Sequence, residues 1–221
     1  MEYQILGVAL WLGIVLVAAE LVARFSPLGG EVSRKIVHIG VGNVILLAWW
    51  LRIPTEVGVA AAVLSGVATL ISYWYPLLAS VSGVGRKSWG TFFYSVSIGL
   101  LIAYFWPRGL ESHAALGVLV MTWGDGLAAL IGQRFGSHRY EVWGMTKSWE
   151  GTATMAIAST LVSGAILIST YGLSWPIGLV SLLVAILATG LEAFSKFGVD
   201  NLTVPLGSAF ISFALVQWWA G

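Results

Sequence analysis

Long apolar stretches separated by short polar connections follow one another along the whole chain. A helix needs about 20 residues to cross a hydrocarbon core of ~30 Å. Eight stretches are long enough to be candidates: residues 3–24, 33–51, 55–75, 90–106, 112–135, 151–171, 176–195 and 203–219. Because the connections are short, consecutive helices should run antiparallel. We therefore expect an all-α fold, a polytopic membrane bundle of about eight transmembrane helices that forms a single domain over residues 1–221.

The composition supports a membrane protein and excludes several other classes. Of the 221 residues, 58% are hydrophobic and only 10% are charged, which is far from the usage of soluble domains. A net charge of +1 gives no reason to expect a nucleic-acid partner, and the lack of cysteine excludes disulfides and thiolate metal sites. The first apolar stretch has no basic start and no convincing cleavage site, so we expect a retained helix rather than a signal peptide.

The positive charges predict the orientation of the bundle. Nine of them lie in or beside alternate connections: Arg24, Arg34, Lys35, Arg86, Lys87, Arg134, Arg139, Lys147 and Lys196. The opposite side has only Arg52 and Arg108. The positive-inside rule then places both termini on the non-cytoplasmic side. An outer aromatic belt is expected from six tryptophans: Trp49, Trp50, Trp106, Trp175, Trp218 and Trp219.

Five polar residues lie within the predicted spans: Glu20, His38, Asn43, Asp125 and Glu192. An ionisable group at the bilayer centre costs roughly 2.5–3.5 kcal/mol on insertion scales, so each needs a partner or water. Most of them are near the cytoplasmic ends of their helices. Together they predict a wet cavity that opens to the cytoplasm.

Asp125 is the residue that is hardest to explain as structure, because it stands between two glycines in an apolar segment. Small residues follow it on one helical face, at Ala128, Ala129, Gly132 and Gly136. Such a face permits close helix packing, but it also permits a base or phosphate to approach the backbone. The segment matches neither a Walker P-loop nor a Rossmann fingerprint, which excludes the soluble nucleotide-binding folds.

Two connections predicted on the cytoplasmic side share Lys-Ser-Trp followed by Gly-Thr, one at residues 87–91 and the other at residues 147–152, where Glu150 is inserted. A serine N-cap with free backbone N–H groups and a preceding lysine can bind an anion. Lys87 with Ser88, and Lys147 with Ser148, are therefore candidate phosphate ligands. Ordinary helix-boundary chemistry is the alternative.

Two further segments carry candidate site residues. Arg34, Lys35 and His38 can share a helix face, as a phosphate-binding cluster or as a snorkelling basic flank. Near the last connection, Asp200 and Asn201 could cap a helix or, with Glu192, supply oxygen ligands to Mg²⁺.

Taken together, these motifs resemble a known family. Its CTP-binding signature is matched by Asp125, Ala128, Gly132 and Gly136, then Lys147, Glu150 and Gly151, and the segments around His38 and Asp200 resemble further motifs of the same family. That family is the polyprenol kinases, which includes dolichol kinases, phytol kinases and CTP-dependent diacylglycerol kinases. The family usually has two adjacent lysines before the Ser/Thr, whereas here the first is Thr146.

The resemblance implies transfer of the γ-phosphate of CTP, with Mg²⁺, to a membrane-dissolved isoprenoid alcohol; the short chain looks most like phytol kinases. Asp125 and Asp200 would hold the metal with Glu192 beside them, and Glu150 or His38 would position or deprotonate the hydroxyl. The catalytic set would also include Lys147. The nucleotide ligands would be Arg34, Lys35, Lys87, Ser88, Gly132, Gly136, Ser148, Gly151 and Asn201.

Several alternatives remain open at this point. A diacylglycerol or polyprenol acceptor would use the same chemistry, and a cytidylyltransferase would release pyrophosphate instead of CDP. From another class, a small transporter could use an Asp–His–Glu proton relay. The oligomeric state, including a homo-oligomer, and the acceptor chain length are not determined by the sequence.

Overall fold

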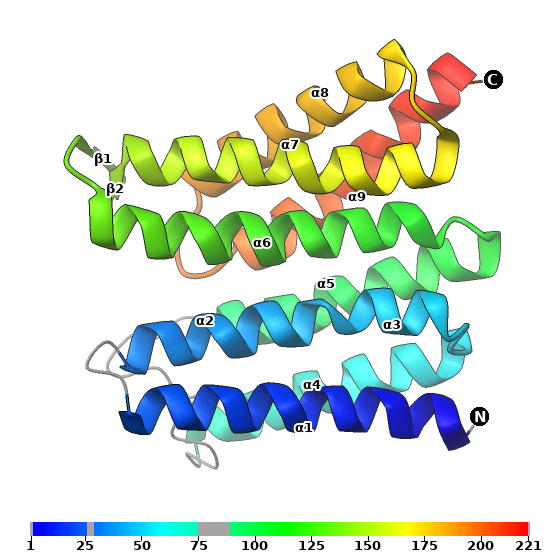
Figure 1. Ribbon diagram of the computed structural model, residues 1–221, viewed down its shortest axis with the longest axis horizontal. Coiled ribbons are helices and arrows are strands. Elements are labelled where there is room, and N and C mark those ends of the chain that lie inside the picture. Colours follow the sequence, from blue (N-terminus) through cyan, green and yellow to red (C-terminus); the bar gives the residue numbers. More distant parts are fainter. Residues whose placement is uncertain (1, 26–28, 75–88, 221) are drawn as a thin grey trace.

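The computed structural model describes residues 2–25, 29–74 and 89–220. The described chain consists of helices that run back and forth along one axis, and one small hairpin (Figure 1). In order, its elements are α1 (Glu2–Phe25), α2 (Gly29–Gly42), α3 (Val44–Trp50), α4 (Thr55–Trp74), α5 (Gly90–Phe105), the 3-10 turn η1 (Trp106–Arg108), α6 (Glu111–Phe135), β1 (Arg139–Val142), β2 (Met145–Ser148), α7 (Trp149–Tyr171), α8 (Trp175–Ala193) and α9 (Asp200–Ala220).

The prediction of a helical bundle with eight membrane spans is confirmed. Eight helical segments are long and apolar enough to cross a bilayer, with α2 and α3 forming one of them. These two helices are separated at Asn43, whose side-chain Oδ1 accepts a hydrogen bond from Trp123 Nε1 at 3.2 Å. The chain is a multi-pass membrane protein.

A β-hairpin occupies the α6–α7 connection, where the sequence suggested only a polar loop. Strands β1 and β2 pair antiparallel, with Tyr140 opposite Lys147 and Val142 opposite Met145. The two-residue turn between them, Trp143–Gly144, has positive φ at both positions. This geometry matches the right-handed twist of a hairpin.

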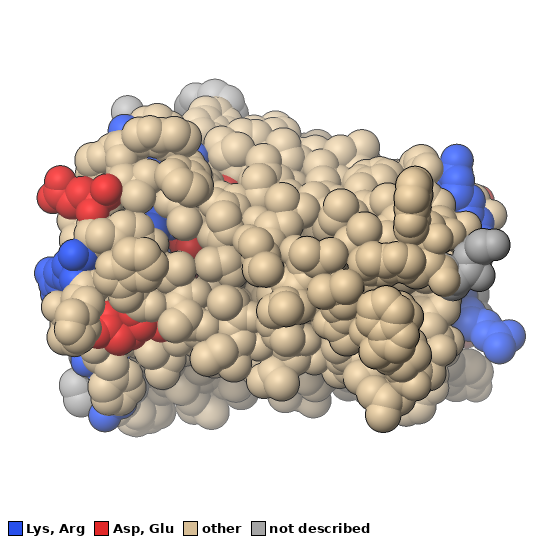
Figure 2. Space-filling model, turned by 90° about the horizontal axis from the view of Figure 1, so that it is seen from above, with Lys and Arg blue, Asp and Glu red and all other residues tan. Residues whose placement is uncertain are grey.

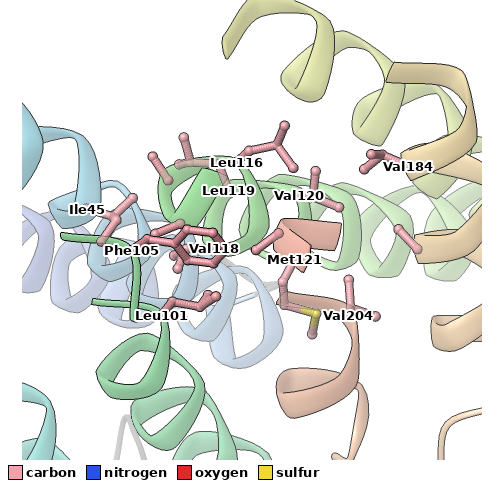
Figure 3. Close-up of a cluster of buried hydrophobic side chains, with 14 of the residues drawn as sticks. Ile45, Leu101, Phe105, Leu116, Val118, Leu119, Val120, Met121, Val184 and Val204 are labelled. Atoms are coloured by element: carbon pink, nitrogen blue, oxygen red, sulfur yellow. The ribbon is translucent and has the colours of Figure 1, made fainter. Parts of the chain in front are cut away.

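Helix α6 is the centre of the bundle and contacts α2, α3, α5, α7, α8 and α9. Its buried side chains, such as Val118 and Met121, pack against Leu101 and Phe105 of α5, Val184 of α8 and Val204 of α9 (Figure 3). Helices α1 and α4 are mostly exposed and present Leu, Ile and Val outward. An apolar exterior with small and apolar residues inside is what a lipid solvent favours.

On the face shown in Figure 2, charged side chains gather at the two ends, and the long middle zone has almost none. The hairpin and the starts of α2 and α7 share one end, while both termini lie at the other (Figure 1). One of the six tryptophans predicted in the outer belt is placed differently. Trp106 is buried, and its Nε1 donates to the carbonyl oxygen of Ile53 at 3.2 Å, because η1 folds it under the end of α5.

Candidate active site

An ion pair between α2 and α6 lies inside the bundle near the hairpin end. Lys35 Nζ is 2.6 Å from Asp125 Oδ2, and both side chains are largely buried. His38, one turn further into the membrane on α2, places its Nε2 3.7 Å from the same oxygen. That Nε2 is buried, and it has no hydrogen-bond partner among the described residues. A buried polar atom without a partner is rare, and it indicates either strain or a missing ligand.

Three residues from three helices form a packed cluster beside the His38 ring. The His38 ring lies 4.9 Å from the ring of Tyr94, and Tyr94 Oη is hydrogen-bonded to Thr122 Oγ1. Thr122 donates its own hydroxyl hydrogen to the carbonyl oxygen of Val118, so the Tyr94 hydroxyl is the donor in their bond. A Cβ on Gly42 would stand 2.0 Å from Thr122 Oγ1 and 2.4 Å from Tyr94 Oη, so only glycine fits there. We call Gly42, Tyr94 and Thr122 the floor of the site.

A second ion pair joins the hairpin to the end of α8. Lys147 Nζ is 2.5 Å from Glu192 Oε1 and also donates to the backbone carbonyl of Glu192. Both side chains are more than four-fifths buried. The carboxylates of Asp125, Glu192 and Asp200 are close enough to interact electrostatically, and Lys147 also acts on Glu192 and Asp200. The two ion pairs and Asp200 therefore form one electrostatic unit.

The glycines of the predicted nucleotide face lie between α6 and α7. Ser148 caps α7 by accepting a hydrogen bond from the Gly151 backbone N–H at 3.2 Å. A Cβ on Gly132 would stand 3.0 Å from Ser148 Oγ, and a Cβ on Gly136 would stand 2.8 Å from both Cβ and Oγ of Ser148. A Cβ on Gly151 would stand 3.1 Å from the carbonyl oxygen of Ala128. Close helix packing accounts for these three glycines, and a direct role in nucleotide binding stays a prediction.

Glu150 fastens the loop after α6 to the start of α7. Its Oε1 accepts hydrogen bonds from the backbone N–H of Ser137 at 3.2 Å, from the Ser137 hydroxyl at 2.6 Å and from the backbone N–H of His138 at 3.1 Å. The imidazole Nδ1 of His138 lies 2.8 Å from the same oxygen. These contacts hold the base of the hairpin in place, which is a structural role for this carboxylate.

The residues at the start of α9 carry oxygen atoms of the kind that a hard divalent cation prefers. Asp200 Oδ1 accepts from the backbone N–H and the side-chain amide of Asn201. Pro205 lies inside α9 and has no N–H, so it cannot donate a hydrogen bond to the carbonyl oxygen of Asn201 four residues earlier. That carbonyl oxygen therefore lacks its usual intrahelical donor. Among the described residues, no three His, Asp or Glu side chains form a ready-made metal cage. Mg²⁺ is commonly held by one or two carboxylates together with substrate phosphates, and Asp125 and Asp200 match that pattern.

Some predicted residues are not placed in this unit. Lys87 and Ser88 lie outside the described residues. The expectation that Glu20 belongs to the inner cavity is wrong, because Glu20 is exposed and pairs with Arg24 one turn along α1 at 2.6 Å. In contrast, no sequence motif marked Tyr94 and Thr122. The only signal for them was two hydroxyl side chains inside apolar spans.

Comparisons with known proteins give a consistent result. The chain is 54% identical over 213 residues to a phytol kinase of Synechocystis sp., covering 96% of this chain and 91% of that protein. It is 30% identical over 222 residues to the chloroplastic phytol kinase 1 of Arabidopsis thaliana, covering 88% of this chain and 70% of the plant protein. The chloroplastic farnesol kinase of the same plant is 27% identical over 229 residues, covering 88% and 72%.

Two other comparisons found nothing. No family model matches the chain, and no solved structure matches it. The full-length similarity to the cyanobacterial protein is sufficient by itself. The chain belongs to the phytol kinase type of the polyprenol kinase family.

Proposed function

We propose that the protein transfers the γ-phosphate of CTP to the hydroxyl of a membrane-dissolved, phytol-like isoprenoid alcohol, giving the alkyl monophosphate and CDP. Membership in the family makes the protein a kinase with an alcohol acceptor. The single observation that carries the assignment to this site is the orphan His38 Nε2 beside the Lys35–Asp125 pair, buried at the membrane side of a cluster of cations.

The donor and the acceptor reach this position from opposite directions. A nucleoside triphosphate is polar and enters from the hairpin end, where the positive-inside rule places the cytoplasm. A lipid alcohol is dissolved in the bilayer and presents its hydroxyl from the membrane side. His38 lies one turn beyond Lys35 on α2, so we propose that its imidazole stands between the phosphates and the lipid hydroxyl.

In the proposed mechanism, the lysines bind the phosphates by giving up their carboxylate partners. Lys35 and Lys147 are now bound to Asp125 and Glu192, which neutralise them inside the bundle. We propose that the triphosphate replaces these carboxylates as their counter-ion, with Arg34 and the N-terminus of α7 at Ser148 adding donors. Asp125 and Asp200 would then hold Mg²⁺, which when bound neutralises the charge that develops on the phosphate oxygens.

The reaction needs one proton acceptor on the alcohol. As the alcohol oxygen forms its bond to the γ-phosphorus, the bond from that phosphorus to the β-phosphate oxygen breaks. The hydroxyl proton passes to His38 Nε2, and the adjacent Asp125 carboxylate stabilises the imidazolium. Of the two candidate bases we favour His38, because its Nε2 has no hydrogen-bond partner among the described residues, whereas the Glu150 carboxylate is engaged by Ser137 and His138.

Label transfer tests the proposal. Purified protein in lipid–detergent micelles would be incubated with Mg²⁺, with γ-labelled CTP or γ-labelled ATP, and separately with phytol, farnesol or diacylglycerol. We expect label in phytol, with CTP as the better donor and CDP as the co-product. Pyrophosphate release would indicate a cytidylyltransferase instead. If no lipid acquires label from either nucleotide, the kinase proposal is wrong.

A further inference from the structure

The tip of the hairpin carries an aromatic residue in a backbone conformation that favours other residues. Trp143 and Gly144 have φ of +50° and +75°. A two-residue turn with positive φ at both positions is normally built from Asn-Gly or Gly-Gly. Residues held in such conformations cluster at functional sites, and a bulky side chain at this position suggests that its ring has a use.

The ring of Trp143 forms an exposed aromatic pair with the end of α8. It lies 5.9 Å from the ring of Phe194 at an interplanar angle of 56°. The two residues nevertheless remain 65% and 58% exposed. Lys196 fixes the turn by donating from Nζ to the carbonyl oxygen of Trp143 at 3.1 Å. We call Trp143 and Phe194 the aromatic pair.

The aromatic pair borders the cation that we assign to the phosphates. Phe194 follows Glu192 by two residues, and Glu192 binds Lys147 through both its carboxylate and its backbone carbonyl. Trp143 and Lys147 belong to the same short hairpin. An exposed aromatic surface thus stands within one hairpin length of Lys147, to which we assign the phosphates, and Lys196 supplies another cation beside Trp143.

We propose that the aromatic pair stacks the base of the nucleoside triphosphate whose phosphates are bound at Lys147 and Lys35. This inference rests on the proposed function and adds the position of the base. The ligand class is a planar heteroaromatic base, with Lys196 close to the ribose and first phosphate. Stacking tolerates any base because each has a π-face, so the aromatic pair supplies affinity and not the choice between CTP and other nucleotides.

Anchoring in the headgroup region is the competing use of an exposed tryptophan. An anchor would affect how the protein sits in lipid and how it receives the alcohol. A stacking surface would affect the nucleotide alone. Phe135 at the end of α6 is a matched control, because it is 59% exposed at the same end of the bundle and its ring contacts Arg134.

The test uses two variants of Trp143 and the control. Trp143→Asn suits the turn better than tryptophan and removes the ring, so the protein should fold at least as well. Trp143→Phe keeps a ring. The KM for CTP, UTP and ATP, the KM for phytol and the equilibrium binding of CDP would be measured for wild type, both variants and Phe135→Ala.

In Trp143→Asn we expect the KM for each nucleotide and the Kd for CDP to rise about 10-fold, within the range of about 5- to 150-fold for loss of one base stack. Trp143→Phe should fall between that variant and wild type. The KM for phytol should not change, and Phe135→Ala should behave as wild type. Unchanged nucleotide KM in Trp143→Asn, or an equal rise in the KM for phytol in both Trp143→Asn and Phe135→Ala, would overturn the stacking role while leaving the kinase intact. A wild type that binds no CDP and labels no alcohol would overturn both proposals.

Discussion

Two histidines inside the bundle are surrounded in opposite ways. At the end that holds the termini, both ring nitrogens of His113 are hydrogen-bonded, Nδ1 to Ser212 Oγ and Nε2 to Tyr171 Oη, each at 2.9 Å. At the hairpin end, His38 has a buried Nε2 with no partner among the described residues. Both ring nitrogens of His113 therefore have hydrogen-bond partners, whereas Nε2 of His38 lacks one among the described residues. The satisfied cluster around His113 ties helices together, whereas the unpaired atom of His38 supports our proposal that a ligand binds there.

The surroundings of the two residues support this reading. His113 is enclosed by the aromatic rings of Phe105 and Phe213, and no ion pair of the described residues includes it. It joins α6 to α7 and α9, which are adjacent in the bundle. His38 instead lies beside the ion pair of Lys35 and Asp125. These surroundings support the proposal that His113 stabilises the bundle and that His38 takes part in the reaction.

The largest effect is expected from Asp125, which carries the charge that sets His38 apart. The Asp125→Asn substitution keeps the shape of the side chain but removes the negative charge that pairs with Lys35 and that we propose holds the metal. Loss of a few kcal/mol of transition-state stabilisation corresponds to about a 1,000-fold decrease in kcat. Lipid phosphorylation by purified protein measures this, with thermal unfolding as the control for folding. An Asp125→Asn variant with full activity would remove the centre of the proposed site.

A smaller effect is expected from the floor beneath His38. Tyr94→Phe and Thr122→Val each remove the hydrogen bond that joins α5 to α6 next to the imidazole, and kcat should fall about 10-fold in each, equivalent to ~1.4 kcal/mol. Because both act through one bond, the double variant should be no worse than either single one. The KM for CTP should not change.

Ser95→Ala is the control for the single and double variants of Tyr94 and Thr122. Ser95 adjoins Tyr94 on α5 and bonds Ser65 of α4 at 3.0 Å, away from His38. Its loss should leave kcat within about twofold of wild type, because a neutral hydrogen bond contributes only ~1 kcal/mol to stability and this one does not face the site. Additive losses in the double variant, or an equal loss in Ser95→Ala, would show that the floor does not position the imidazole.

The smallest effect is expected at Glu192, which the sequence assigned to the metal and the structure pairs with Lys147. If Glu192 is the resting counter-ion of Lys147, Glu192→Gln keeps a hydrogen-bond acceptor but no longer competes with phosphate. The KM for CTP should fall about threefold, equivalent to ~0.6 kcal/mol, with kcat nearly unchanged. A metal ligand would behave differently: kcat would drop more than 100-fold and depend steeply on the Mg²⁺ concentration.

The sequence predicted the spans and one polar cavity holding Asp125 and His38, because both follow from strong local rules, but it did not predict the ion pair of Asp125 with Lys35. Apolar length defines a span, and a charge inside the membrane needs a partner on a neighbouring helix. The pairing of Lys147 with Glu192 and the attachment of Glu150 to Ser137 and His138 could not be predicted, because they depend on how the hairpin folds back over α8 and the loop after α6. The floor was also missed, since its formation depends on the rotation of three helices about their axes.

Replacing each of the two histidines with glutamine tests most directly whether one end of the bundle serves catalysis and the other serves stability. His38→Gln and His113→Gln would be compared by kcat for phytol phosphorylation and by the midpoint of thermal unfolding in the same micelles. We predict that His38→Gln loses about 100-fold in kcat, as expected for a general base, and unfolds like wild type. His113→Gln should retain kcat within about twofold and unfold at a lower temperature, because glutamine cannot satisfy both Ser212 and Tyr171 in the ring geometry. Full activity in His38→Gln, or loss of kcat in a stable His113→Gln protein, would contradict the assignment.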